Sequence, residues 1–313
     1  MSLIELETNS RRFLTDGGLE TTMTFENGFD LPHFASFTLL DSPEGRDALT
    51  TYFDRYIDIA EKSAAGFVLD TLTWRANKSW GLEMGMSDEQ IIATNEACVA
   101  FARTIRDRRA SASLPILING IIGPASDGYV VGDAITVAQA QAVHGLQIQT
   151  LGRAKADLIS ALTITTAAEG AGIAKAAQEI DLPVVISFTV ETDGQLPSGE
   201  SLALAIELVD GATDAYPLYY MINCAHPDHF RDAVAMGESW TSRIGGLRAN
   251  ASRMSHAELD NAEELDAGDP SELGQLHSEL LTLLPNVRVL GGCCGTDHRH
   301  VDAISNASTD RAA

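Results

Sequence analysis

The 313-residue chain has few cysteines and few basic residues, and it lacks any long apolar run. Four cysteines are too few for the disulfide framework of a secreted protein of this length, so we expect reduced thiols. Lysine and arginine number 21 against 44 acidic residues, and the net charge of −23 argues against nucleic acid or an anionic membrane as a partner. No apolar run approaches the roughly 20 residues that span a bilayer.

The first residues also lack the pattern of a secretory signal. Residues 1–5 contain no basic segment followed by an apolar one. With the acidic composition and the reduced thiols, this predicts a cytoplasmic protein. The sequence leaves the oligomeric state open.

Short apolar runs alternate with helix-like segments along the chain. The runs that we predict as strands are Phe13–Thr15, Phe67–Thr73, Pro115–Ile122, Asp157–Thr165, Pro183–Val190, Tyr216–Cys224, Arg243–Ala249 and Val287–Gly291. The segments that we predict as helices are Gly45–Ala65, Asp88–Arg109, Val137–Lys155, Ala167–Ile180, Leu202–Ala212, Pro227–Met236, Ser271–Leu284 and His298–Ser305. The polar, acidic segment Asn250–Pro270 is interpreted as an insertion after the seventh strand.

This alternation predicts the fold class. Strands that alternate with helices form a parallel sheet, and eight such units in a chain of this length are typical of a closed barrel. Runs that are apolar at nearly every position suit strands buried on both faces. We therefore predict an α/β fold, a single (β/α)8 TIM barrel over residues 1–313. An open, doubly wound sheet is the alternative, although no Gly-x-Gly-x-x-Gly motif follows the first strand.

Three of the four cysteines stand at predicted strand ends. Cys224 ends the sixth strand, and Cys293 and Cys294 directly follow the eighth within a glycine-rich segment. In a parallel barrel the carboxyl ends of the strands form one rim, where catalytic groups gather. Strand ends two apart lie on the order of 10 Å from each other, a gap that inward-pointing side chains close. The three thiols are therefore expected to meet.

Three thiolates in one place indicate a metal site. Thiolates are soft ligands that select Zn²⁺. A structural zinc site has four protein ligands, often as two Cys-x-x-Cys pairs, and neither pair is present. Three ligands leave one position for a substrate, and zinc lowers the pKa of a thiol that it binds. The set therefore favours a catalytic zinc that acts on a sulfur substrate.

Other interpretations of the cysteines stay open. Cys293 and Cys294 are alternatively two packed thiols, or a redox-active vicinal disulfide. Cys98 lies within a helix-like segment and is interpreted as a buried apolar residue.

Polar residues near the cysteines and at the first strand end also have two possible roles each. Four histidines near the cysteine motifs are possible ligands, although they more ordinarily begin helices after strand ends: His226, His229, His298 and His300. Asp16 is either a turn residue before two glycines or a carboxylate that orients a substrate amino group.

Three segments resemble the signature motifs of the zinc-dependent homocysteine S-methyltransferase family. They are Asp16–Thr21 (Asp-Gly-Gly-Leu-Glu-Thr), Asn223–Pro227 (Asn-Cys-Ala-His-Pro) and Gly291–Thr296 (Gly-Gly-Cys-Cys-Gly-Thr). Further matches are Asn119-Gly120 with Gly123-Pro124, and Ser187-Phe188 with Asp193-Gly194. The resemblance runs from about residue 12 to residue 305.

The resemblance implies a homocysteine-binding-like barrel that holds Zn²⁺ through Cys224, Cys293 and Cys294. It also implies a methyltransferase that methylates homocysteine or a similar thiol, as in methionine biosynthesis. Family donors include S-methylmethionine, S-adenosylmethionine and betaine, and the chain has no room for cobalamin or folate modules. A small onium donor is therefore expected. The expected catalytic residues are Asp16 and the three cysteines, and the expected substrate contacts are Asp16, Glu20, Thr73, Trp74, Arg75, Asn119 and Asn223.

The chain departs from the family pattern on the substrate side. Leu162 stands where members carry a glutamate that helps hold the substrate's amino group, Trp74-Arg75 replaces a Tyr-Gln pair, and Ile121 replaces a small serine. Asp16 is then the expected anchor for an ammonium group. Arg75 favours a substrate carboxylate if it points into the barrel mouth, and otherwise lies in solvent or pairs with an acid such as Glu83.

Two functions from different classes fit these residues. The first is zinc-dependent transfer of a methyl group to a thiol. The second is a non-catalytic or redox protein of the same fold that binds zinc or thiols. The intact set of three cysteines favours the first.

Overall fold

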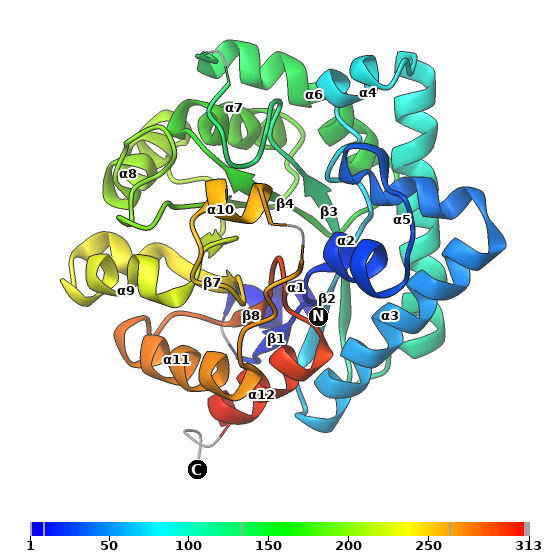
Figure 1. The fold of residues 1–313 in the computed structure, drawn as a ribbon. Helices are drawn as coiled ribbons and strands as arrows, with labels where there is room; N and C mark the ends of the chain where they lie inside the picture. The colour runs from blue at the N-terminus through cyan, green and yellow to red at the C-terminus, as the bar shows by residue number, and fades with distance from the viewer. Residues whose placement is uncertain (1, 9, 133, 263, 310–313) are drawn as a thin grey trace.

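The computed structural model describes residues 2–8, 10–132, 134–262 and 264–309. Eight strands close into a barrel in which each strand pairs in parallel with its neighbours in chain order, and β8 returns to β1. Helices surround this barrel, which Figure 1 shows end-on. The predicted (β/α)8 barrel is confirmed, and the pairing of β1 with β8 excludes the open sheet.

The strands are short and completely buried. They are β1 Phe13–Leu14, β2 Gly66–Asp70, β3 Ile116–Ile122, β4 Leu158–Ile164, β5 Val184–Phe188, β6 Tyr220–Asn223, β7 Ile244–Ala249 and β8 Val289–Gly292. Alternate side chains face opposite ways. One set, which includes Val68 and Leu117, packs in a small cluster inside the barrel, and the other, which includes Leu69 and Ile118, packs in the large core beneath the helices.

Every predicted helix is present, with its ends shifted by a few residues. The helices of the repeating units are α3 Pro43–Lys62, α5 Asp88–Arg109, α6 Val137–Arg153, α7 Ala167–Gln178, α8 Leu202–Thr213, α9 Pro227–Ala235, α11 Pro270–Leu283 and α12 His298–Thr309. Their first residues follow from local signals. Ser87 and Thr136 form capping boxes at α5 and α6, and proline opens α3, α9 and α11.

The structure also contains short helices that the sequence pattern did not predict. They are α1 Ser2–Glu7, α2 Leu19–Thr21, α4 Lys78–Glu83 and α10 His256–Asp260, with further helical turns at Thr22–Glu26, Pro32–Phe34 and Ser36–Asp41. Segments this short do not show a full amphipathic period. Figure 1 shows α10, in orange, in front of the barrel mouth, so the predicted insertion after β7 passes over the opening.

The predicted strands all extend at least one residue beyond the observed ones, and the largest single overruns are at the end of the second and at the start of the sixth. The second ends at Asp70 rather than Thr73 because the chain turns outward there, and the sixth begins at Tyr220 rather than Tyr216. Among the described helices, none is long and apolar enough to cross a membrane.

Candidate functional site

Three thiols meet at the carboxyl-end rim of the barrel. Cys224 follows β6 directly, and Cys293 and Cys294 follow β8. The Sγ atom of Cys224 lies 2.7 Å from that of Cys293 and 3.5 Å from that of Cys294. Among the described residues, these three form the one group of potential metal ligands, with all Sγ atoms within 4.8 Å of one another. Cys98 is buried in the core on α5, as expected.

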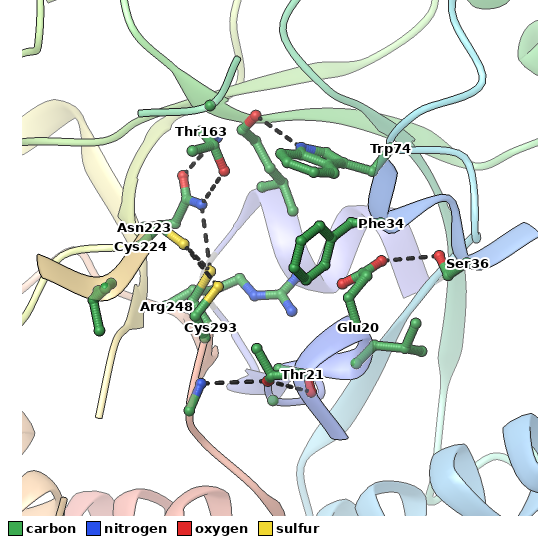
Figure 2. A pocket seen from close by; sticks show the side chains of 18 of the residues that line it. Glu20, Thr21, Phe34, Ser36, Trp74, Thr163, Asn223, Cys224, Arg248 and Cys293 are labelled. Atoms are coloured by element: carbon green, nitrogen blue, oxygen red, sulfur yellow. Dashed lines mark hydrogen bonds between the residues drawn. The ribbon is translucent and has the colours of Figure 1, made fainter. Parts of the chain in front are cut away.

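A buried amide holds the strand ends beneath the thiols. Asn223 Oδ1 accepts hydrogen bonds from the Thr163 backbone N–H at 2.9 Å and from the Ser187 hydroxyl at 2.6 Å. The Asn223 Nδ2 donates to Thr163 Oγ1 at 2.9 Å and points toward Cys293 Sγ at 3.8 Å (Figure 2). Thr163 and Cys224 both have a left-handed backbone, with φ of 60° and 55°. Such φ values are strained outside glycine and gather at functional sites.

Glycines allow the turns after β1 and β8 to approach each other. A Cβ on Gly18 would lie 2.7 Å from the Cys293 carbonyl oxygen, and one on Gly292 would collide with the Thr296 hydroxyl. Gly295 has φ of 75°, which side chains disfavour. The glycines of both motifs are therefore required by the close packing that positions Cys293.

A tyrosine contacts two of the thiols, and a histidine of α10 stacks on its ring. The Tyr129 hydroxyl, between β3 and α6, lies 3.4 Å from Cys224 Sγ and 3.3 Å from Cys294 Sγ. Its ring stacks on that of His256 in α10, with centroids 4.1 Å apart. His256 Nε2 lies 2.8 Å from the Cys224 carbonyl oxygen, and Nδ1 lies 2.9 Å from Glu191 Oε1. The sequence did not single out Tyr129 or His256, because neither follows a strand end directly.

The surroundings favour a thiolate at Cys293. Hydrogen bonds from Cys224 and Cys294, with the nearby Arg248 guanidinium, hold the pKa of Cys293 well below its ordinary value. The hydrogen bonds to its two neighbours and its burial raise the pKa of Cys224. One anionic sulfur among three packed thiols makes this a place that attracts a soft cation.

Arg248, on β7, pairs with two aspartates in the floor of the site. Its guanidinium donates to Asp16 Oδ1 at 2.5 Å and to Asp70 Oδ2. Asp16 Oδ2 accepts from the Tyr52 hydroxyl at 3.2 Å, and Asp70 Oδ1 accepts from Asn119 Nδ2 at 2.8 Å. Burial raises the pKa of Asp16 to about 7, against the lowering effect of Arg248. Each aspartate oxygen therefore already has a partner.

Arg75 is buried, with 5% of its surface exposed, and lies between two indole rings. Its guanidinium carbon is 3.9 Å from the Trp74 ring centroid and 3.8 Å from that of Trp80. Its Nε donates to the His33 carbonyl oxygen and its Nη1 to that of Ser126, both at 3.2 Å. Burial lowers the pKa of Arg75 to about 10. No described ion pair includes it, and its observed contacts fasten two loops together.

The thiols open into a pocket of about 330 Å³ at the barrel mouth. Figure 2 shows Trp74, Phe34 and Glu20 on the side of the pocket that faces the cysteines. In this view the Arg248 guanidinium is drawn between the cysteines and Glu20. The Trp74 indole N–H lies 3.4 Å from the Leu162 carbonyl oxygen, and Leu162 adds apolar surface to the lining. The pocket therefore has a sulfur side and an aromatic side.

Most of the predicted substrate contacts line this pocket. The lining includes Asp16, Glu20, Trp74, Arg75 and Asn223, together with the three cysteines. Two other predicted residues lie beneath it among the described side chains: Thr73 donates to the Ile121 carbonyl oxygen at 2.7 Å, and Asn119 bonds Asp70. The sequence missed Asp70 and Arg248, although both stand at strand ends. The sequence signal that would have identified them is the presence of an acidic and a basic residue at the carboxyl ends of two strands, which share one rim of the barrel.

The four histidines near the cysteine motifs serve other roles in the described part of the chain. His226 caps α9, and His229 and His300 contact backbone carbonyl oxygens. His298 is exposed. None of them joins the cluster of potential metal ligands.

Comparison with known proteins places the chain in a family. The model of the family described as homocysteine S-methyltransferase matches residues 13–308. Homocysteine S-methyltransferase 1 of Arabidopsis thaliana is 21% identical over 312 residues, which cover 93% of this chain and 92% of that protein. Homocysteine S-methyltransferase 3 of Arabidopsis thaliana is 22% identical over 211 residues, which cover 63% and 58%.

Solved structures share the fold. The metallated form of the homocysteine methyltransferase MmuM from Escherichia coli superposes with a TM-score of 0.73 at 20% identity, covering 98% of this chain and 99% of that one. Its oxidized form gives 0.71 at 21% identity, with 94% and 95% covered. Because the family model spans the barrel from β1 to α12 and includes all three thiols, the chain belongs to the homocysteine S-methyltransferase family and is a methyltransferase.

Proposed function

We propose that the protein uses Zn²⁺ to transfer a methyl group from a small onium donor to the sulfur of a thiol such as homocysteine, giving methionine. The observation that carries the proposal is the convergence of Cys224, Cys293 and Cys294 on one pocket. A pocket of about 330 Å³ suits ligands of metabolite size. The proposed donor is of the S-methylmethionine, S-adenosylmethionine or betaine type.

The donor set fits zinc. Three sulfur ligands within 4.8 Å of one another match the chemistry that zinc prefers, and the pocket leaves room for a substrate beside them. When bound there, the ion would lower the pKa of an acceptor thiol, so that its sulfur is a nucleophile at neutral pH.

The chain's own residues would hold and enclose the reactants. The Asn223 amide, aimed at Cys293 Sγ, restrains that thiol, and the Tyr129 hydroxyl does the same for Cys224 and Cys294. Trp74 and Phe34 supply aromatic faces that attract the positive charge of an onium group. The donor's methyl group would then lie between the aromatic side and the sulfur side of the pocket.

The proposal is tested with reduced, zinc-reconstituted protein, three onium donors and homocysteine. We expect methionine, measured by mass spectrometry, with at least one of S-methylmethionine, S-adenosylmethionine and betaine. Chelation and Cys293→Ser should abolish its formation, whereas Cys98→Ser should not. Methionine formation that survives chelation would disprove the role of zinc. Failure of every donor with homocysteine and other small thiols would disprove methyl transfer.

A further inference from the structure

The carboxylates of the inner pocket differ in whether they have a cationic partner. Asp16 and Asp70 share Arg248, and each of their four oxygens accepts a hydrogen bond. Asp16 was the residue expected from the sequence to bind an ammonium group. Its negative charge is already paired with Arg248, and Tyr52 donates to its other oxygen, so a substrate cation there would have to share this carboxylate with a guanidinium.

Glu20, a third carboxylate that lines the pocket, has no such partner. It lies in α2, directly after the β1 turn, and its Oε1 accepts one hydrogen bond, from the Ser36 hydroxyl at 2.9 Å. No described lysine or arginine forms an ion pair with it. Figure 2 shows its side chain beside Phe34, on the side of the pocket that faces the cysteines. Partial burial removes water from this carboxylate, which destabilises its charged form. A cation bound there would compensate for the lost solvation.

We propose that Glu20 binds the ammonium group of the thiol acceptor, an inference that rests on the proposed methyl transfer. The acceptor sulfur would lie at the three cysteines, and a short alkyl chain would carry its ammonium group across the pocket to Glu20. The favoured acceptor class is therefore a small aminothiol. Leu162, near the end of β4, lines the same pocket and offers no charge to such a group, so Glu20 would supply the carboxylate.

A purely structural role for Glu20 is the competing explanation, because its bond to Ser36 joins α2 to the helical turn Ser36–Asp41. The two roles are separable by substitution. Glu20→Gln keeps an oxygen that accepts from Ser36 and removes only the negative charge. Glu26→Gln, at an exposed position outside the pocket lining, makes the same chemical change as a matched control.

The experiment compares three thiols on zinc-loaded wild type, Glu20→Gln and Glu26→Gln, by calorimetric binding and by KM and kcat. Besides its thiol, homocysteine carries an amino group and a carboxylate. The thiol 3-mercaptopropylamine carries only the amino group, and 4-mercaptobutanoate carries only the carboxylate. Loss of one charge-assisted hydrogen bond should weaken homocysteine and 3-mercaptopropylamine about tenfold to hundredfold in Glu20→Gln. Binding of 4-mercaptobutanoate, kcat and the KM of the donor should not change, and Glu26→Gln should resemble wild type.

Other results would overturn the assignment. Unchanged homocysteine binding in Glu20→Gln, equal weakening of all three thiols, or weakening of the donor instead would each refute it. Binding distinguishes this failure from failure of the proposed function. If wild type binds the aminothiols but transfers no methyl group, the proposed function is wrong. The comparison of thiol binding to wild type and Glu20→Gln still shows whether Glu20 binds the ammonium group. If wild type binds none of the thiols, both are wrong.

Discussion

Cys293 is the thiol whose neighbours favour its anionic form. Its Sγ lies 2.7 Å from Cys224 Sγ and 3.8 Å from the Asn223 Nδ2, and the Arg248 guanidinium is nearby. Its neighbours stabilise its anionic form, whereas those of Cys224 stabilise the protonated form. A metal ion that binds all three as thiolates must therefore displace protons mainly from the neighbours of Cys293, so its affinity falls as pH falls.

We expect Cys224→Ser and Cys293→Ser to lose bound zinc while the barrel stays folded. The side chains lie at the rim of the barrel, outside the packed core, so the loss is local. Metal content by mass spectrometry and circular dichroism measure the two effects. Cys98→Ser is the control, because its thiol is buried in α5 away from the site. Full zinc retention in both rim variants would contradict the ligand assignment.

At the scale of elements, the pocket walls are loops that a few buried contacts join. Arg75 connects the turn Pro32–Phe34, where His33 and Phe34 have positive φ, to the loop that carries Tyr129. The same loop is anchored at its start by Asn77, which donates to the Gly123 and Pro124 carbonyl oxygens. The loops around the pocket are thus tied to each other and to the segment between β2 and α4.

Arg75→Ala should loosen both loops. Two charge-assisted hydrogen bonds and the stacking on Trp74 and Trp80 are lost, which should lower the free energy of unfolding by about 2–4 kcal/mol. Hydrogen exchange should rise in residues 31–36 and 123–130. Arg55→Ala, at an exposed position on α3, should change neither quantity. Unaltered exchange in the two loops would mean that Arg75 does not hold them.

At the scale of the whole molecule, stability depends on groups that the folded barrel keeps uncharged. His277, on α11, is completely buried, and burial lowers its pKa from 6.5 to about 4. Its Nε2 has no partner among the described residues, and its Nδ1 lies 2.8 Å from the Leu273 carbonyl oxygen. The unfolded chain binds a proton near pH 6.5, but the folded chain does not until about pH 4. Stability from this residue is therefore complete above pH 6.5 and is lost as the pH falls toward 4.

His277→Leu should flatten the pH dependence of unfolding. The difference in pKa corresponds to about 3 kcal/mol, so the wild type should lose about this much more than the variant between pH 7 and pH 4. Urea denaturation at a series of pH values measures it. The same substitution at exposed His298 should leave the slope as in wild type. Parallel curves for wild type and His277→Leu would show that His277 does not set the slope.

The sequence by itself determined the fold class and the three thiols. Apolar runs and helical segments are local patterns that can be recognised in the sequence. Eight repeated strand–helix units close into a barrel, so all eight units were predictable. Cys224, Cys293 and Cys294 were predictable for the same reason, because a strand end fixes which rim a residue occupies. The reason for the glycines around Cys293 emerged only from the structure, in which a Cβ on Gly18 would lie 2.7 Å from the Cys293 carbonyl oxygen.

Only the tertiary structure decided how the pocket is charged and covered. Arg248 lies 232 residues from Asp16 along the chain, so no local pattern predicts that it occupies this carboxylate. Tyr129 reaches the thiols from a loop, whose course depends on contacts with distant segments rather than on its own sequence period. Arg75, expected in the barrel mouth or in solvent, is held between two tryptophans because packing offered its guanidinium aromatic faces and carbonyl oxygens. Strand ends are set by short-range patterns, but charge partners are set by which distant side chains share a buried space.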